Sequence, residues 1–212
     1  MKRIIIAVAV VVGLSLTMVA RSQDKQKPTD EFRRQYIREF KRIGLNTTPG
    51  DAMMLRILVE SGKFKRGIEV GTSTGFGALN MGWAFERNGG QLFTLEIDPK
   101  AAAIAREHIA KMGLEKTVTV VEGDALKTLP ALEGEFDFIF IDALKQDYLK
   151  YLQAVLPKMR PGALIVADNV IKSEKQMPDY LEFVKNEQMF DTVIIRASEE
   201  KGDGMAISYK LK

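Results

Sequence analysis

The chain has 212 residues, 46% of them apolar, which is enough for one well-buried domain and too short for two domains of ordinary size. The absence of cysteine excludes disulfides, thiolate zinc sites and cysteine nucleophiles, and the single histidine, His108, excludes a metal site built from several histidines. The excess positive charge comes from Lys2, Arg3 and Arg21, so the rest of the chain is neutral and lacks the basic surface of a nucleic-acid binder; we expect no nucleic-acid partner.

Residues 1–22 have the pattern of a secretory signal peptide or a membrane anchor, because Lys2 and Arg3 precede an uncharged apolar run over residues 4–20. We expect residues 23–43 to form a linker and a basic amphipathic helix, and residues 44–212 to form the folded domain. More Lys and Arg residues follow the apolar run than precede it, which favours an uncleaved membrane anchor with the domain in the cytosol. Cleavage after Ser22 and export is the alternative.

The next elements alternate between helix and strand. A helix is predicted from Thr29 or Asp30 to Ile43, since either residue can cap it and apolar residues recur at helical spacing. Strand-like apolar runs follow at 67–70, 92–97, 118–121, 136–141 and 163–167, separated by helical stretches such as 99–112 and 146–156. This alternation predicts an α/β fold with a doubly wound, mostly parallel sheet and helices on both faces.

Two further runs, 192–196 and 205–210, complete a seven-stranded sheet. No helix fits between them, so the last strand is predicted to be antiparallel, with "GDG" at 202–204 as the hairpin turn.

Ligands of such sheets bind beyond the carboxyl ends of the strands. The first strand runs into "GTSTGFG", whose glycines allow a sharp turn and close approach of a ligand. Its spacing is not the G-x-G-x-x-G of dinucleotide enzymes, which disfavours the alternative of a nicotinamide-dependent oxidoreductase. The next two strands end at Glu96, which can accept both ribose hydroxyls, and at Asp124, which can also cap the following helix. Acidic strand ends around a glycine turn predict a nucleoside pocket.

Five segments, in this order, resemble the class I S-adenosylmethionine (SAM)-dependent methyltransferases, and within them the metal-dependent O-methyltransferases typified by catechol and caffeoyl-CoA O-methyltransferases. They are residues 69–84, beginning "EVGTSTGFG", then "LEIDP", "GDA", "IDALKQDY" and "ADNV". The resemblance runs from about Asn46 to the C-terminus and implies a Rossmann-like fold, SAM as cofactor, a small catechol-like hydroxylated acceptor and a possible homodimer. By position, it implies cofactor contacts from Asn46, Thr47, Glu69, Gly71, Ser73, Gly77, Glu96, Ile97, Asp124, Ala125 and Asp142.

The same resemblance accounts for charged residues after the fourth and fifth strands. Asp142, Asp168 and Asn169 offer oxygen donors on adjacent strand ends, a set that suits Mg²⁺ or another divalent cation. Such an ion would acidify the acceptor hydroxyl. In the family a lysine at the place of Lys145 is the general base, so Lys145 and Asp142 are the predicted catalytic residues.

This chain departs from the family pattern at several positions. Ala143 and Leu144 replace a pair that is often polar or aromatic, and Gly77 stands where many relatives have a hydroxyl residue. Residues 171–189 are expected to form part of a lid over the acceptor, with Tyr180 and Phe183 as its aromatic residues. A membrane-tethered, non-catalytic binding protein on the same scaffold is a further alternative, because a fold alone does not determine function.

Overall fold

A single seven-stranded sheet runs through the molecule. The computed structural model describes residues 27–198, 200 and 202–212. The strands are β1 (Arg66–Val70), β2 (Gln91–Glu96), β3 (Val118–Glu122), β4 (Phe136–Ile141), β5 (Met159–Ala167), β6 (Phe190–Ser198) and β7 (Asp203–Lys210), in the spatial order β3-β2-β1-β4-β5-β7-β6. Strands β1 to β5 pair in parallel, and β7 pairs antiparallel with both β5 and β6. The predicted α/β sheet with an antiparallel last strand is confirmed.

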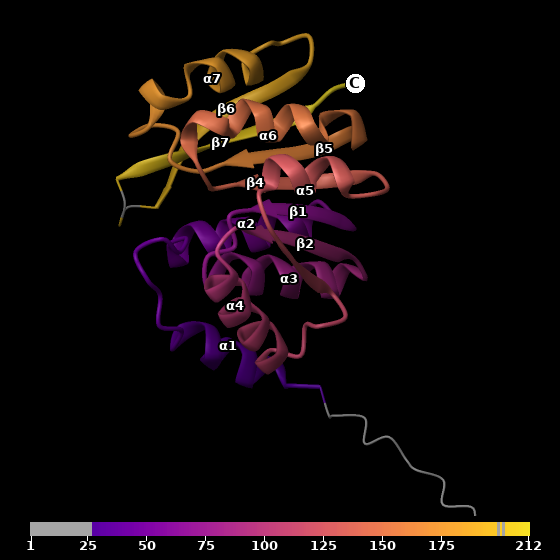
Figure 1. Ribbon diagram of the computed structural model, residues 1–212, viewed down its shortest axis with the longest axis vertical. Coiled ribbons are helices and arrows are strands. Elements are labelled where there is room, and N and C mark those ends of the chain that lie inside the picture. The colour runs from indigo at the N-terminus through magenta and orange to yellow at the C-terminus, as the bar shows by residue number, and fades with distance from the viewer. Residues whose placement is uncertain (1–26, 199, 201) are drawn as a thin grey trace, which may run out of the picture.

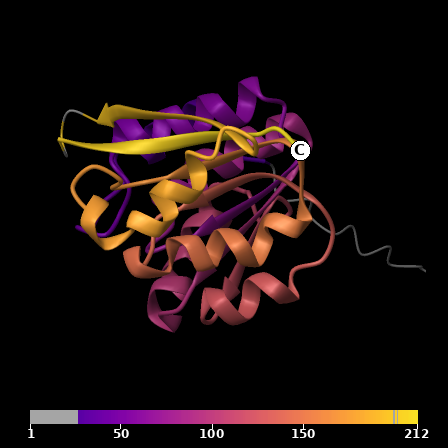
Figure 2. The same cartoon turned by 90° about the horizontal axis from the view of Figure 1, so that it is seen from above.

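Helices cover both faces of this sheet (Figures 1 and 2). They are α1 (Asp30–Arg38), α2 (Pro49–Ser61), α3 (Phe76–Asn88), α4 (Pro99–Lys111), α5 (Ala125–Ala131), α6 (Tyr148–Val155) and α7 (Pro178–Val184), with short 3-10 turns η1 (Lys145–Asp147), η2 (Leu156–Lys158) and η3 (Glu174–Gln176). Alternate side chains of β4 point to opposite faces of the sheet. Ile139 and Ile141 pack with α6 and α7, whereas Phe138 and Phe140 pack with α2 and α3.

Local sequence fixes where three of the helices begin. Thr48 caps α2 by accepting from the Asp51 amide, Asp98 caps α4 and Asp124 caps α5, and a proline follows directly in the first two cases. Helices α4 and α5 begin just beyond the carboxyl ends of β2 and β3, so these caps also fix the backbone at that edge of the sheet.

Helix α1 differs from its prediction in two ways. It ends at Arg38 instead of Ile43, and its fully buried residue is a charged one, Arg33, with an exposed fraction of 1%. Tyr36, Ile37 and Phe40 pack against the core only in part. The physical reason is that α1 lies against a charged part of α3, so that ion pairs, and not apolar burial alone, hold it there.

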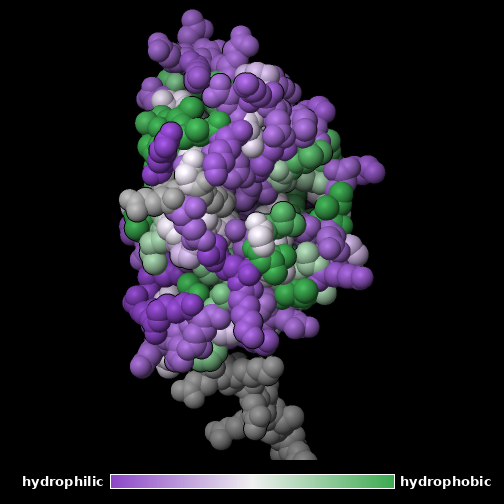
Figure 3. Space-filling view, turned by 90° about the vertical axis from the view of Figure 1, so that its left-hand side faces the viewer, coloured by the Kyte–Doolittle hydropathy of each residue, from purple (hydrophilic) through white to green (hydrophobic). Residues whose placement is uncertain are grey.

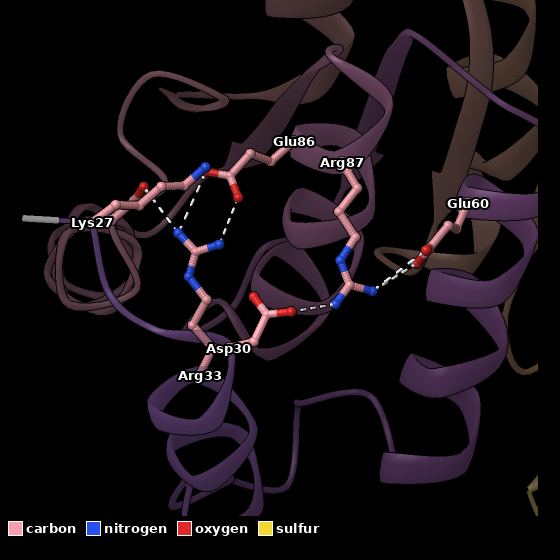
Figure 4. A network of polar contacts seen from close by, with 7 residues as sticks. Lys27, Asp30, Arg33, Glu60, Glu86 and Arg87 are labelled. Atoms are coloured by element: carbon pink, nitrogen blue, oxygen red, sulfur yellow. Dashed lines mark hydrogen bonds and ion pairs between the residues drawn. The ribbon is translucent and has the colours of Figure 1, made fainter.

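Figure 4 shows this network of ion pairs between α1, α2 and α3. Arg33 Nη1 donates to Glu86 Oε2 over 2.5 Å, and Lys27 Nζ lies 3.0 Å from Glu86 Oε1. Arg87 bridges Asp30 of α1 and Glu60 of α2 at 2.9 and 3.1 Å. Trp83, over whose ring Arg33 and Arg87 lie, is buried in the core.

The prediction of a signal peptide or membrane anchor over residues 1–22 lies outside the residues that the structure describes. Within residues 27–198, 200 and 202–212, no helix has the length and apolar character needed to cross a membrane.

Candidate active site

The sheet register brings the predicted strand-end residues into one row. At the carboxyl edge of the sheet, neighbouring strands are joined in one row of register partners, namely Leu95, Val70, Ile141 and Ala167. The residues that follow them are Glu96, Gly71, Asp142 and Asp168. The chain order of the strands reverses between β1 and β4, which is where parallel sheets of this kind bind ligands. Figure 3 views the side where the loop before α2 and the β6–β7 hairpin lie, and it shows apolar patches among polar ones.

The glycine turn allows protein segments to approach one another closely. Gly71 and Gly75 have φ of +97° and +98°, and Ser73 between them has φ of +49°. A Cβ atom on Gly71 would overlap the carbonyl oxygen of Asp142, and one on Gly77 would overlap Oε1 of Glu69. We expected these glycines to admit a ligand; at Gly71 and Gly77 they admit protein atoms that form the wall of the site.

Glu69, near the end of β1, is a buried carboxyl group with an exposed fraction of 1%. Thr94 Oγ1 donates to its Oε2 over 2.5 Å, and the hydroxyls of Thr94 and Thr72 are also hydrogen-bonded. Burial raises the pKa of Glu69 to about 8; the Thr94 bond opposes this shift and the charges of Asp142 and Glu96 add to it. Glu69 is therefore mostly protonated at pH 7, and a cation bound nearby would favour its ionised form.

Glu96 and the loop before α2 surround the glycine turn. Glu96 Oε2 accepts from the Ser73 amide over 2.6 Å, and Asn46 Oδ1 accepts from Thr74 Oγ1 over 2.9 Å. Asn46 Nδ2 and Ser73 Oγ are among the buried polar atoms without a partner in the described part of the chain. Buried polar atoms are normally hydrogen-bonded, so a polar ligand at this turn would complete the bonding of both residues. The residues present thus fit a nucleoside cofactor.

The remaining predicted cofactor residues lie at the same edge with different surroundings. Thr47 is buried beside Asn46, whereas Ile97, after β2, is 69% exposed. Asp124 Oδ1 accepts from the Leu126 amide over 2.9 Å, so its carboxylate caps α5, and Ala125 is the first residue of that helix.

Lys145 lies between two oxygen atoms. Its Nζ atom donates to Asp142 Oδ1 over 2.9 Å and to the Tyr148 hydroxyl over 2.7 Å. That hydroxyl in turn donates to the backbone oxygen of Asp168 over 3.2 Å. Burial, with the charges of Asp142 and Asp168, raises the pKa of Tyr148 well above 10, so Tyr148 stays neutral. Tyr148 had no predicted role, although its position three residues after Lys145 could have indicated the contact.

Asp168 and Asn169 follow β5. The Asn169 amide donates to Asp168 Oδ1 over 2.7 Å, and Asn169 adopts φ of +61°. In the described residues no three His, Cys, Asp or Glu side chains are grouped to hold a metal. The predicted donor set instead combines the carboxylates of Asp142 and Asp168 with an amide oxygen, and an all-oxygen set of this kind fits a hard divalent cation.

The prediction of "GDG" as the hairpin turn holds for Gly202, whereas Asp203 and Gly204 already belong to β7. Asp203 has an exposed fraction of 4% and is the first residue of β7. Burial would raise its pKa, but hydrogen bonds from the backbone of Lys172, Gly204 and Ile171 and from the Asn169 side chain lower it overall. A polar residue between two glycines resembles a turn in sequence, and only the fold shows that this one is enclosed.

Of the expected aromatic lid residues, Tyr180 lies in the core and Phe183 is partly buried against it. Tyr180 is fully buried with its ring edge-on to Tyr148, the ring centroids being 5.6 Å apart, and Phe183 packs on Phe190. Both residues hold α7 against the sheet, so neither forms an exposed platform over an acceptor.

Sequence comparisons relate the chain to known O-methyltransferases. The sequence profile of a family described as O-methyltransferase matches residues 19–208. A catechol O-methyltransferase from Niastella koreensis is 40% identical over 139 residues, covering 64% of this chain and 62% of that protein. One from Mycobacterium tuberculosis is 39% identical over 137 residues, covering 63% and 60%. The chain therefore spans about three-fifths of the length of these relatives.

Solved structures show the same fold. An O-methyltransferase from Bacillus cereus in complex with SAH has a TM-score of 0.74 and 27% identity, covering 88% of this chain and 94% of that one. The O-methyltransferase TomG from Streptomyces achromogenes, in complex with SAM, has a TM-score of 0.75 and 26% identity, covering 85% and 88%.

Proposed function

The chain belongs to the O-methyltransferase family, and from this premise we propose that it transfers the methyl group of SAM to a hydroxyl of a small, catechol-like acceptor with the help of a divalent cation. The observation that carries the proposal is the contact of Lys145 with Asp142 in the row of strand ends beside the glycine turn. At one edge of the sheet, this row brings together groups that could bind a nucleoside, bind a hard cation and accept a proton.

The cofactor half of the proposal is supported by unpaired polar atoms and by Glu69. Glu96 offers a carboxylate to the ribose hydroxyls, and Asn46 Nδ2 and Ser73 Oγ lack protein partners. Glu69 is buried against Gly77 and can ionise in response to a positive charge. SAM supplies a sulfonium-bound methyl group, which is electrophilic, and these residues would orient it.

The cation half is supported by the donor set. Asp142, Asp168 and Asn169 would hold Mg²⁺ or a similar ion, which would polarise two vicinal acceptor oxygens. Lys145 would accept the proton of the acceptor hydroxyl at Nζ. Bound SAM would supply the methyl group for the new oxygen–carbon bond, with its own sulfur–carbon bond broken and the thioether as the leaving group. Asp142 and Tyr148 fix the position of Nζ for this transfer.

Exposed apolar side chains support an acceptor with an apolar ring. Leu144, next to Lys145, is 59% exposed, and Leu45, next to Asn46, is 80% exposed. Large apolar residues left open beside polar functional groups are a common feature of small-molecule sites. The nicotinamide-dependent oxidoreductase has no comparable support, and the contact of Lys145 with Asp142 favours a catalytic protein over a non-catalytic scaffold.

The test is methyl transfer from labelled SAM, in Mg²⁺, to catechol, a hydroxycinnamoyl ester and a hydroxylated nucleoside. Phenol serves as a matched control because it lacks the second hydroxyl that would chelate the cation. We expect labelled product with at least one vicinal diol and none with phenol. Equal rates with catechol and phenol would contradict the chelation, and no product with any vicinal diol would contradict the acceptor class.

A further inference from the structure

Asp203 is a buried carboxylate whose two oxygens have different partners. Oδ1 accepts from the backbone amides of Ile171, Lys172 and Gly204 over 3.1, 2.9 and 2.8 Å. Oδ2 accepts from Asn169 Nδ2 over 3.3 Å. One oxygen therefore holds the backbone after β5, and the other oxygen holds a side chain that we assign to the cation site.

This contact decides which way the Asn169 amide faces. A carboxylate has acceptors only, so Asn169 must present its NH₂ group to Asp203 and not its oxygen. The two polar atoms of a carboxamide lie on opposite sides of the group, so the amide oxygen is turned away from Asp203. Without such a partner, the two orientations of an asparagine amide differ little in energy.

The backbone around this contact is also fixed. The Val170 amide donates to the backbone oxygen of Gly204 over 3.0 Å, which ties the start of β7 to the turn after β5. A Cβ atom on Gly204 would lie 2.6 Å from both the Ile171 side chain and the Ile195 backbone oxygen, so the close approach requires glycine here. The "GDG" segment thus places a carboxylate against Asn169 through a rigid backbone junction.

We propose that Asp203 is a positioning residue, which holds the Asn169 amide with its oxygen directed to the cation site; the inference rests on the proposed function of that site. Groups that orient metal ligands typically change metal affinity by about 10- to 100-fold when they are replaced. Asp203 would act on the cation through Asn169 alone, without touching substrate or cofactor.

The substitution D203N separates orientation from support of the backbone. An amide oxygen in the place of Oδ1 can still accept from the backbone of residues 171, 172 and 204, while the new NH₂ group faces the NH₂ of Asn169. The Asn169 amide is then expected to rotate, so that its oxygen faces the new NH₂ group of residue 203 and its own NH₂ group faces the cation. The charge-matched control is D191N, an exposed carboxylate near the other end of the β6–β7 hairpin.

The probe is Mn²⁺ alone, titrated against the full chain and followed by the electron paramagnetic resonance signal of the free ion. We expect D203N to bind Mn²⁺ about 10- to 100-fold more weakly than the wild type, D191N to match the wild type, and melting temperatures to stay similar. The double substitution N169D/D203N restores a donor facing an acceptor and is expected to regain most of the affinity. If D203N alone does not fold, the Mn²⁺ affinity of the double variant tests the role of Asp203 instead.

Unchanged affinity in D203N, or a double variant that fails to recover affinity, would overturn the role of Asp203 while leaving the proposed function in place. A wild-type chain that binds no Mn²⁺ would instead refute the cation site itself, and the role of Asp203 with it.

Discussion

Glu69 couples the site to pH because its surroundings favour the protonated form. Burial raises its pKa to about 8, whereas a glutamate in an unfolded chain titrates near about 4.3. Between these values the folded protein holds a proton that the unfolded chain has lost. The contribution of Glu69 to the free energy of unfolding is therefore greatest below the lower value and falls as the pH rises toward the upper one.

The substitution E69Q should remove this dependence. We expect the free energy of unfolding of E69Q, relative to the wild type, to increase between pH 5 and pH 8, by up to roughly 1.4 kcal/mol per pH unit. Urea unfolding of the cofactor-free protein at several pH values measures this difference in the free energy of unfolding. The substitution of the exposed Glu115, Glu115→Gln, serves as the control. A constant difference between E69Q and the wild type across this range would show that Glu69 does not titrate there.

In the proposed mechanism, proton transfer depends on Lys145. K145M keeps the length of the side chain and removes the amine, so it should lower kcat by about 10²- to 10⁴-fold, as for other lost general bases. Mn²⁺ affinity should stay close to that of the wild type, because Lys145 is not among the proposed ligands. Full activity in K145M would assign the proton transfer to another group.

Residues at strand ends were predictable from the sequence, whereas their partners were not. Glu96 and Asp142 follow apolar runs that visibly end in a polar residue, so their place at the edge of a parallel sheet could be inferred. Tyr148 contacts the backbone of Asp168, 20 residues away, and Asp203 contacts Asn169, 34 residues away. No local pattern encodes such pairs, because they exist only once the strands are placed side by side.

Helix α1 shows the same limit at the scale of an element. Its apolar spacing predicted a helix correctly, but the burial of Arg33 follows from Glu86, 53 residues further along the chain. Burial alone would raise the pKa of Glu86, yet the hydrogen bonds from Arg33 and Lys27 lower it. The pair therefore holds α1 on α3 in its ionised form.

The substitution R33M should weaken this docking. It leaves Glu86 with only Lys27, whose side chain is 63% exposed, and breaking a buried ion pair costs on the order of 3 kcal/mol in the free energy of unfolding. R38M, at the exposed end of the same helix, is the matched control and should change stability little. Equal urea midpoints for the two variants would show that α1 is held by its apolar contacts.

The alternation of strands and helices along the whole molecule was enough to predict the doubly wound sheet. The order of the strands is not contained in that alternation, and it determines which strand ends meet. Here β1 and β4 are neighbours although two strands lie between them in sequence, which places Gly71 beside Asp142. The resemblance of the motifs to a known family, and not their periodicity, indicated this arrangement.

At this scale we also propose that residues 1–22 stay attached as a membrane anchor, with the domain in the cytosol where SAM is made. The support is the larger number of Lys and Arg residues after the apolar run. Protease added to intact spheroplasts should spare a C-terminal tag. Digestion of that tag, or a mature chain beginning at Gln23, would favour export.

We propose above that the carboxyl edge of this sheet is a cation-dependent methyltransferase site. The measurement that tests it most directly is the rate of labelled methyl transfer from SAM to catechol by the full chain, after exhaustive removal of metal, in EDTA and then in excess Mg²⁺. We predict no transfer above background in EDTA, recovery on addition of Mg²⁺, and no recovery in Asp168→Ala, which loses one of the three proposed ligands. Undiminished transfer in EDTA, or full activity of the Asp168→Ala variant, would contradict the account.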